Sequence, residues 1–250
     1  SERRSRLFGI LNGIDYETCN PKADSFLEYK YDAKTLLRRA KNKEILRRHF
    51  NLPVRKKNMP ILGIASRLTD QKGFGLLLDA GYPLLDNFDF QLVVVGTGDS
   101  HYMSFFQNLA KTYPSKVAIH LSYDEALAHL IFGGADAILI PSRFEPCGLT
   151  QMEAMRYGAV PIVRKTGGLA DSVENYEPES QKGTGFVFEK FDHYEFYGAV
   201  VRGLETYRYP KFWQGIQKRA MAADFSWTRS AKEYIDLFKK AIKFHRQPFS

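Results

Sequence analysis

Residues 137–157 read AILIPSRFEPCGLTQMEAMRY, and this stretch decides the fold. The apolar run 137–140 is typical of a buried parallel strand, and residues 149–157 have the character of a helix that stops at Gly158. The loop between them therefore follows the carboxyl end of a strand. Open α/β sheets bind ligands at that edge.

The same loop carries an acid and a possible anion site. Glu145 precedes the predicted helix, and the backbone N–H groups of Gly148, Leu149 and Thr150 are first-turn donors without helical acceptors. Such donors suit a phosphate. The loop is therefore predicted to be one wall of an active site.

Working outward, apolar strands alternate with helical segments joined by short loops. The predicted strands are 60–65, 90–95, 117–121, 136–140, 159–163 and 185–188. The predicted helices are 75–85, 100–112, 123–132, 149–157, 192–207, 211–222 and 228–244. This alternation predicts an α/β fold, a doubly wound parallel sheet of the Rossmann-like kind.

The first 55 residues do not join the alternation. Residues 7–15 suggest a strand end and a turn, 16–33 a loop, and 34–48 an amphipathic helix with a solvated basic face. Residues 1–58 hold 15 Lys or Arg against 7 Asp or Glu, whereas the rest of the chain holds 21 of each. The surplus of +8 therefore belongs to the leading segment. Nucleic-acid binding is not favoured, because no interleaved aromatics or known motif accompany these cations.

Composition sets further limits. The 250 residues are 44% apolar, enough for one sizeable core, and no run is long enough for a membrane span. The charged start 1–4 does not resemble a signal peptide. The two cysteines, Cys19 and Cys147, lie far apart, and the histidines lack metal-ligand spacing. A protein of the reducing cytosol, without a membrane partner or a metal site, is expected.

A second cation-bearing loop follows the first core strand. Residues 66–73 read SRLTDQKG and place Arg67 and Lys72 at the predicted ligand-binding edge. Two cations there can hold a diphosphate and stabilise a leaving group, as Mg²⁺ does in other enzymes. Taken alone, they read as solvated loop cations. Their position at the same edge as Glu145 favours the clamp.

Two glycine-containing turns also follow strands. Gly96 and Gly98 fail the dinucleotide fingerprint, because His101 occupies the third glycine position, and a close approach of a ligand is expected instead. Thr166, Gly167 and Gly168 open a helix after the fifth strand. Close approach of a ligand and a simple strand-to-helix turn explain this second turn equally well.

Several motifs together resemble bacterial glycogen synthases and plant starch synthases. The matching stretches are SRLTDQKG at 66–73, PSRFEPCGLTQ at 141–151, RKTGGLAD at 164–171, DFSW at 224–227 and LNGID at 11–15. The resemblance covers nearly the whole chain. It implies the C-terminal half of a retaining GT-B glycosyltransferase, which moves glucose from ADP-glucose to the non-reducing end of an α-1,4-glucan. It also implies an interdomain hinge segment and basic helix at 1–55 and a nucleotide-sugar-binding domain with C-terminal helices at 56–250.

The resemblance also implies roles for individual residues. Arg67 and Lys72 would hold the donor diphosphate, and Glu145 the transferred glucose. The remaining substrate-binding residues implied are Gly148, Leu149, Thr150, Tyr123 against the adenine, Asn12 reaching the glucose, Thr166 and Gly167. No cofactor or metal is implied, and the glucan acceptor would bind through the N-terminal half that this chain lacks.

Two other functions stay open from the sequence. One is a related GT-B transferase of the sucrose or trehalose-phosphate type that uses UDP-glucose. The CGLTQ form of the acid loop at 147–151 argues against it. The other is a non-catalytic module that binds nucleotides or polyanions, which the basic leading segment favours.

Overall fold

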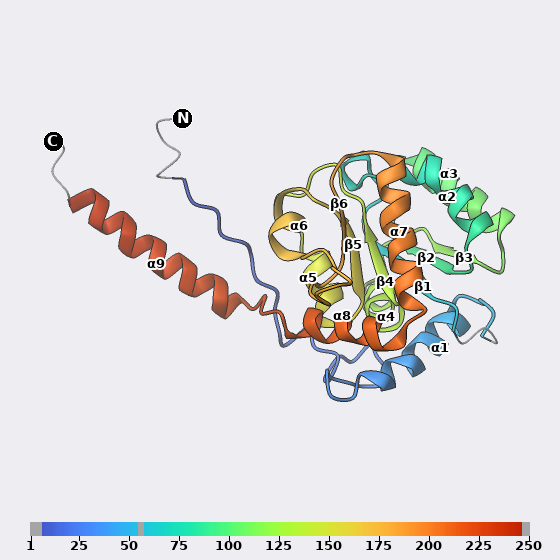
Figure 1. Cartoon of the computed structure of the whole chain (residues 1–250), viewed down its shortest axis with the longest axis horizontal. Coiled ribbons are helices and arrows are strands. Elements are labelled where there is room, and N and C mark those ends of the chain that lie inside the picture. The colour runs from blue at the N-terminus through green and yellow to red at the C-terminus, as the bar shows by residue number, and fades with distance from the viewer. Residues whose placement is uncertain (1–6, 55–57, 247–250) are drawn as a thin grey trace.

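The computed structural model describes residues 7–54 and 58–246. Its centre is one six-stranded, all-parallel sheet in the order β3-β2-β1-β4-β5-β6 (Figure 1). The strands are β1 (Ile61–Ala65), β2 (Gln91–Val95), β3 (Val117–His120), β4 (Ala137–Ile140), β5 (Val160–Arg164) and β6 (Phe186–Phe188). This architecture confirms the predicted doubly wound fold.

The strand order reverses between β1 and β4. The chain builds β1, β2 and β3 outward in one direction, then returns to place β4, β5 and β6 on the other side of β1. A crevice forms at such a switch point, outside the carboxyl ends of the two central strands. The fold therefore directs the loops after β1 and β4 toward one place.

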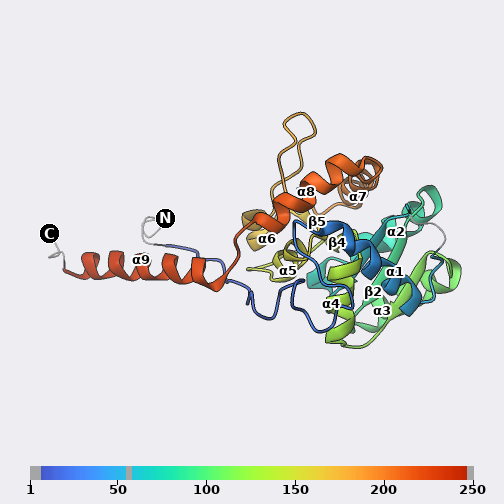
Figure 2. The same ribbon diagram turned by 90° about the horizontal axis from the view of Figure 1, so that it is seen from below.

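Helices cover both faces of the sheet. The helices of the described residues are α1 (Arg39–His49), α2 (Gly75–Asn87), α3 (Ser100–Thr112), α4 (Glu125–Gly134), α5 (Thr150–Arg156), α6 (Gly167–Ser172), α7 (His193–Tyr207), α8 (Pro210–Ala222) and α9 (Trp227–Arg246). One face packs against α2, α3 and α7, and the other against α1, α4 and α5 (Figures 1 and 2). Burial on both faces explains why the strands read as continuous apolar runs.

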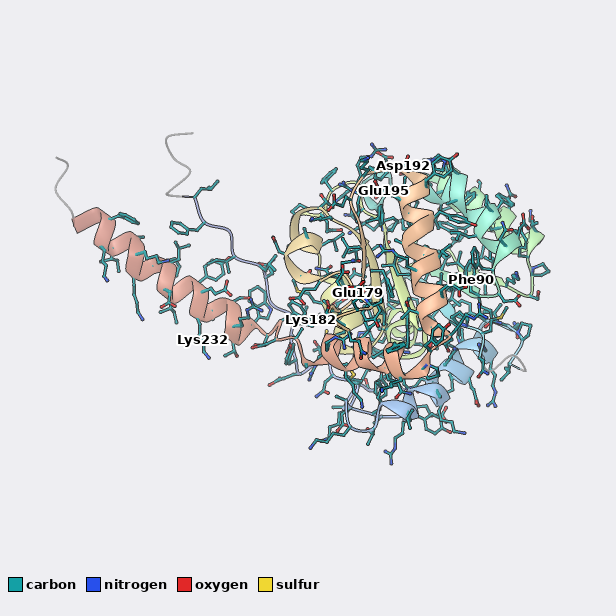
Figure 3. The ribbon with its side chains drawn as sticks, in the orientation of Figure 1. Phe90, Glu179, Lys182, Asp192, Glu195 and Lys232 are labelled. Carbon is teal, nitrogen blue, oxygen red and sulfur yellow. The ribbon has the colours of Figure 1, made fainter. Side chains whose placement is uncertain are left out.

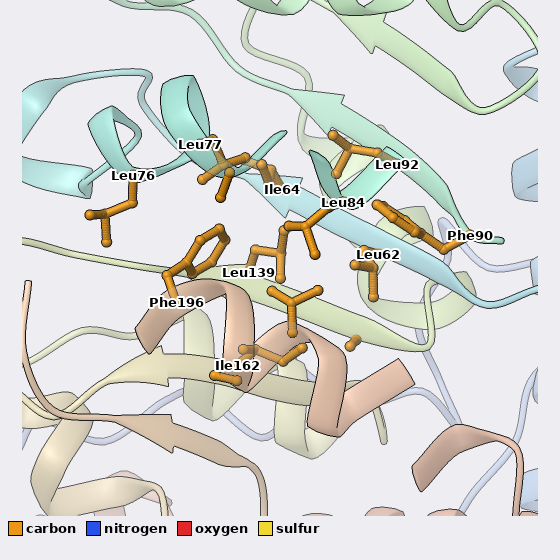
Figure 4. Close-up of a cluster of buried hydrophobic side chains, with 14 of the residues drawn as sticks. Leu62, Ile64, Leu76, Leu77, Leu84, Phe90, Leu92, Leu139, Ile162 and Phe196 are labelled. Carbon is orange, nitrogen blue, oxygen red and sulfur yellow. The ribbon is translucent and has the colours of Figure 1, made fainter. Parts of the chain in front are cut away.

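The two cores follow from the pleat of the strands. Leu62 and Ile64 of β1 point into the core beneath α2 and α7, together with Leu139 and Ile162 (Figure 4). Ile61, the neighbour of Leu62 in the same strand, packs in the core on the opposite face of the sheet. Alternate side chains of one strand thus serve different cores, because successive Cβ atoms leave a strand on opposite faces.

Helix α7 begins at the carboxyl edge of the sheet, and helix α9 lies away from the sheet. Asp192 caps the start of α7 by accepting hydrogen bonds from the N–H groups of Tyr194 and Glu195, at the carboxyl edge of the sheet (Figure 3). Helix α9, which carries Lys232, projects away from the sheet with the leading segment beside it (Figures 1 and 3). An apolar face of α9 is therefore exposed, including Trp227, Ile235 and Phe238.

The leading segment differs from its predicted form in two respects. Residues 7–13 form no strand, and only Ile14 pairs, through a single bridge with Ser226. Helix α1 buries three of its cations, Arg39, Lys43 and Arg47, so the prediction of a solvated basic face was wrong for these three. Carbonyl and side-chain acceptors compensate for their desolvation, as buried charge requires. The predicted boundary at 55/56 and the charged start 1–4 lie outside the described residues.

Candidate active site at the carboxyl edge of the sheet

Four loops meet at the carboxyl edge, and their backbones are bonded to one another. The loop after β1 meets the loop after β2, the loop after β4 meets the β1 loop, and the turn before α6 meets the β4 loop. The bonds are Leu68 N–H to Thr97 O (2.9 Å), Arg143 N–H to Gln71 O (2.9 Å) and Gly168 N–H to Glu145 O (2.9 Å). The loops thus form one connected surface.

Glu145 is the central acid of this surface. Its side chain is nearly buried, and its Oε2 accepts hydrogen bonds from Lys72 Nζ at 2.6 Å and from Ser142 Oγ at 3.1 Å. Lys72 closes a 3-10 turn, Asp70–Lys72, in the β1 loop. The structure therefore brings together the acid of one predicted loop and a cation of the other.

Arg67 lies on the same loop as Lys72 but remains exposed. Within residues 7–54 and 58–246 its guanidinium has no ion-pair or hydrogen-bond partner. Ser66, Lys72, Ser142 and Thr150 line a narrow cleft between the ends of β1 and β4. An exposed, unpaired cation such as Arg67 can bind an anion at little desolvation cost.

The turn before α5 supplies backbone donors. Gly148 has φ +72°, a left-handed conformation that favours glycine, and α5 begins two residues later. The N–H groups of Gly148, Leu149 and Thr150 donate to no acceptor in the described parts of the chain. They are available to an anion near Lys72, as the sequence predicts.

The glycines of the neighbouring turns allow the loops to pack closely. A Cβ at Gly168 would lie 1.7 Å from Cys147 O, and one at Gly167 would lie 2.1 Å from Glu145 O. A Cβ at Gly96 would lie 1.9 Å from Ser66 O, and Gly98 meets Leu68 O in the same way. In this structure, the atoms that come close to these glycines belong to the protein's own backbone. Contact of Gly167 with a substrate stays a prediction.

The other predicted residues occupy different positions around the edge. Tyr123 is 82% exposed in the loop after β3, and Thr166 precedes α6, half-buried. Asn12 is exposed on the leading segment, which is bonded to the start of α9 through Ser230 Oγ and Leu11 O. None of the described contacts joins Asn12 to Glu145. The substrate roles of these three residues stay predictions.

Sequence reasoning missed the residues that hold the acid loop. Arg164, at the end of β5, donates its Nε–H to Ser142 O at 2.9 Å and a second N–H to Arg143 O. Arg143 stacks over the ring of Phe191 at 4.1 Å and pairs with Asp70 at 3.2 Å. Burial and the charge of Arg143 lower the pKa of Arg164. Arg164 lies within the RKTGGLAD motif, which was the only sequence signal for it.

No group of three or more His, Cys, Asp or Glu side chains in the described ranges is arranged to hold a metal ion. In the same ranges, no helix combines the length and the apolar content needed to cross a membrane.

Comparison with known proteins places this geometry in a family. Residues 47–211 match the family described as "Glycosyl transferases group 1". The chain is 48% identical to the glycogen synthase of Thermotoga maritima over 96% of its own length and 49% of the relative's. It is 44% identical to glycogen synthase 1 of a Synechocystis species over 94% of its length and 49% of the relative's.

A solved structure agrees with these relatives. The catalytic domain of starch synthase IV from Arabidopsis thaliana, solved with ADP and acarbose, superposes with a TM-score of 0.87 at 38% identity. The superposition covers 96% of this chain and 50% of that one. The chain thus spans about half the length of the relatives it matches, and the resemblance seen in its motifs is confirmed. By sequence and by fold, this chain belongs to the group 1 glycosyl transferases.

Proposed function

We propose that this chain is the donor-binding half of an ADP-glucose-dependent glucan synthase, which extends an α-1,4-glucan with retention. The observation that carries the proposal is the Lys72–Glu145 pair beside the free N–H groups of 148–150. One acid and several anion-binding groups at one switch point suit a sugar linked to a diphosphate. The presence of ADP in the related starch synthase structure supports a nucleoside diphosphate here.

The chemistry follows from the charges. Cleavage of the donor C1–O bond gives the sugar oxocarbenium character and leaves extra negative charge on the diphosphate. Arg67, Lys72 and the N–H groups of 148–150 stabilise the diphosphate, while Glu145 stabilises the developing positive charge on the sugar. The two cations perform the charge stabilisation, so the proposal requires no divalent metal.

Lys72 has two roles in this proposal. In the free chain its ammonium group donates to Glu145, whereas with donor bound it turns toward the diphosphate. The 3-10 turn that carries Lys72 and the loop that carries Glu145 can each adjust, because neither lies inside a strand or long helix. Donor binding then frees Glu145 for the glucose while Ser142 continues to hold the carboxylate.

A second half completes the enzyme in this proposal. The chain spans about half the length of its relatives, and α9 exposes apolar side chains that nothing in the described structure covers. Without the other half, water enters the site and the acceptor hydroxyl is not oriented, so the large gain from orientation is lost. We therefore expect the chain alone to bind the donor nucleotide but not to extend a glucan.

The experiment has two arms. Calorimetry of the chain with ADP in EDTA should show binding, and UDP should bind more weakly. Labelled glucose from ADP-glucose should enter glycogen only when the chain is joined to the N-terminal half of the Thermotoga maritima relative. A folded chain that does not bind ADP would contradict the proposal. Preference for UDP would favour a GT-B transferase of the sucrose or trehalose-phosphate type. Nucleic-acid binding with a steep salt dependence would favour a polyanion-binding module.

A further inference from the structure

A buried glutamine lies directly behind the unpaired N–H groups of the acid loop. Gln151 is the second residue of α5, and none of its surface is exposed, although its side chain ends in a polar amide. The amide Nε2 donates to Gly148 O at 2.8 Å and to Cys147 O at 3.3 Å. The side chain therefore folds back from the helix onto the turn that precedes it.

The two carbonyls that Gln151 holds belong to the peptide units of the anion site. Cys147 O shares one rigid, planar unit with the N–H of Gly148, and Gly148 O shares the next unit with the N–H of Leu149. In a trans peptide unit the C=O and N–H bonds point in opposite directions. Two carbonyls turned toward the buried amide therefore turn both N–H groups away from it, and neither donates to an acceptor in the described ranges.

The surroundings of the amide fix its orientation. Ser172 of α6 places its Oγ 3.0 Å from Nε2, and its own hydroxyl proton is donated to Gly168 O. The Ser172 oxygen is therefore an acceptor toward Gln151. A rotated amide would set Oε1 against two backbone carbonyl oxygens, which can only accept. The donor side of the amide must therefore face the turn.

The opposite end of the same amide lacks a partner. Oε1 of Gln151 is buried and accepts no hydrogen bond from the described residues. An unpaired buried acceptor destabilises a fold, so stability alone does not account for a glutamine at this position. A Cβ at Gly148 would lie 2.5 Å from this oxygen, so the close packing of the amide adds to the positive φ in favouring glycine there.

The main chain of the acid is tied to the same support. Gly168 N–H donates to Glu145 O at 2.9 Å, and Ser172 bonds to Gly168 O within α6. Helix α6 thus contacts the acid loop through Gly168 and the amide of Gln151 through Ser172. One buried network therefore sets the position of the acid relative to the outward N–H groups.

We propose that Gln151 is a positioning residue for the donor diphosphate. Its amide does not touch the ligand but holds the N–H groups of Gly148 and Leu149 in the outward direction before the ligand arrives. Donors that are already oriented bind an anion without a further cost of reorganisation. The inference rests on the proposed function, which supplies the diphosphate.

A matched pair of variants tests the proposal. Gln151→Met keeps the unbranched shape of the side chain and removes both N–H donors. ADP affinity, measured by calorimetry, should fall about ten-fold or more. The control is Gln217→Met in α8, because Gln217 is also buried and donates to a backbone carbonyl, that of Gly158 at 2.7 Å. Gly158 follows the far end of α5, so both variants should lower the melting temperature but only Gln151→Met should weaken ADP binding.

A spectroscopic signature separates positioning from a general loss of stability. Amide protons that bond to phosphate move downfield in the NMR spectrum, so ADP should displace the signals of Gly148 and Leu149 in the unaltered chain. At saturating ADP this displacement should be smaller in Gln151→Met, because the N–H groups no longer point at the phosphate. A variant that had lost only affinity or stability would show the full displacement once it is saturated.

A second variant covers the case in which Gln151→Met does not fold. Gln151→Asn keeps the amide but is one methylene shorter, so its nitrogen falls short of the two carbonyls. ADP affinity and the displacement of the two amide signals should fall in the same direction as for the methionine variant, and by less.

The outcomes distinguish this inference from the proposed function. Unchanged ADP affinity in folded variants of Gln151, an equal loss in Gln217→Met, or a full displacement of both amide signals at saturation would overturn the inference. Each of these results leaves the proposed function standing, because the unaltered chain still binds ADP. An unaltered, folded chain that does not bind ADP would overturn both.

Discussion

The molecule contains two lysine–carboxylate pairs of equal length at opposite edges of one sheet. Lys72 Nζ lies 2.6 Å from Glu145 at the carboxyl edge, and Lys43 Nζ lies 2.6 Å from Asp136 at the amino edge. Their surroundings differ. Lys43 is on a long helix and Asp136 directly precedes a strand, whereas Lys72 and Glu145 are both in loops.

The difference teaches which pair is structural and which is exchangeable. Asp136 Oδ2 also accepts the N–H of Ile61 at 2.7 Å, and Lys43 also donates to Tyr207, so every member of the amino-edge pair is fixed by a further contact. At the carboxyl edge, Glu145 also accepts a hydrogen bond from Ser142, whereas Lys72 has Glu145 as its one described partner, and the N–H groups of residues 148–150 remain unpaired in the described parts of the chain. The amino-edge pair is therefore fixed from both sides, whereas the carboxyl-edge pair is the one that our proposed function expects a ligand to open.

The largest expected effect comes from breaking the structural pair. Asp136→Ala leaves Lys43 buried without its carboxylate and Ile61 N–H without its acceptor, and burial already lowers the pKa of Lys43. Removing one member of a buried pair costs about 3–5 kcal/mol. The free energy of unfolding in urea should fall by that amount. Glu145→Ala should cost clearly less, and equal losses for the two variants would erase the proposed distinction.

The next effect concerns nucleotide affinity. Arg67→Ala removes a cation that has no partner in the described structure, so stability should barely change. ADP affinity should fall by about 1.5–3 kcal/mol, because a charge-assisted contact to phosphate is lost. The control is Lys165→Ala, which removes an exposed cation already paired with Glu189 at 2.8 Å. Calorimetry that shows equal ADP affinity for both variants would exclude Arg67 from the diphosphate clamp.

The sequence predicted the fold well because the fold depends on two local signals, apolar runs for strands and glycines that end helices. Strands buried on both faces read as apolar runs, as at 137–140, and glycine after the helix at Gly158 marks its end. The burial of Arg39, Lys43 and Arg47 could not be predicted from the neighbouring sequence. Asp136 and Gln91, which accept from Lys43 and Arg47, are more than 40 residues away in the chain.

The site was predicted in the same partial way. Glu145 and Lys72 could be placed at one edge, since strand ends of a parallel sheet share an edge, and the structure joins them. The role of Arg164 could not be predicted, because it donates to backbone carbonyls, and every residue type has a backbone carbonyl. The packing of Gly168 on Cys147 was hidden for the same reason.

A glycine pair tests how firmly the carboxyl-edge loops are packed. Gly168→Ala forces a Cβ toward Cys147 O, so the acid loop must shift, and overpacking of this kind costs about 1–3 kcal/mol. ADP affinity should fall as well, because residues 148–150 move with the loop. Gly198→Ala, inside α7 with no atom within 4 Å of the new Cβ, should instead stabilise by about 0.5–1 kcal/mol. Thermal unfolding and ADP calorimetry check both, and normal ADP binding by Gly168→Ala would show that the loop is not rigid.

The smallest effect is a pH dependence in the contacts that attach the leading segment to the sheet. His129 Nδ1 lies 2.8 Å from Asp24 Oδ2, and Tyr157 Oη–H donates to the same oxygen at 2.6 Å. The hydrogen bond and the charge of Asp24 raise the pKa of His129 against its burial. Burial alone would raise the pKa of Asp24, but the hydrogen bonds from His129 and Tyr157 outweigh it and the pKa is lowered.

The signs of these two shifts fix the pH window. Because the folded pKa of His129 is raised, its stabilisation is full below the unfolded value of about 6.5 and is lost as pH rises through the folded pKa. Because that of Asp24 is lowered, its stabilisation is present above about 3.9 and is lost as pH falls. The pair should therefore stabilise most between about pH 4 and 6.5. His129→Gln should lower the free energy of unfolding by about 0.5–1.5 kcal/mol in that window and by less at pH 8. The control His101→Gln changes an exposed histidine of α3 and should leave the free energy of unfolding unchanged at both pH values. Unfolding free energies measured from pH 4 to 8 decide the matter, and a loss for His129→Gln that is independent of pH would show that the imidazole acts there only as a neutral hydrogen-bond partner.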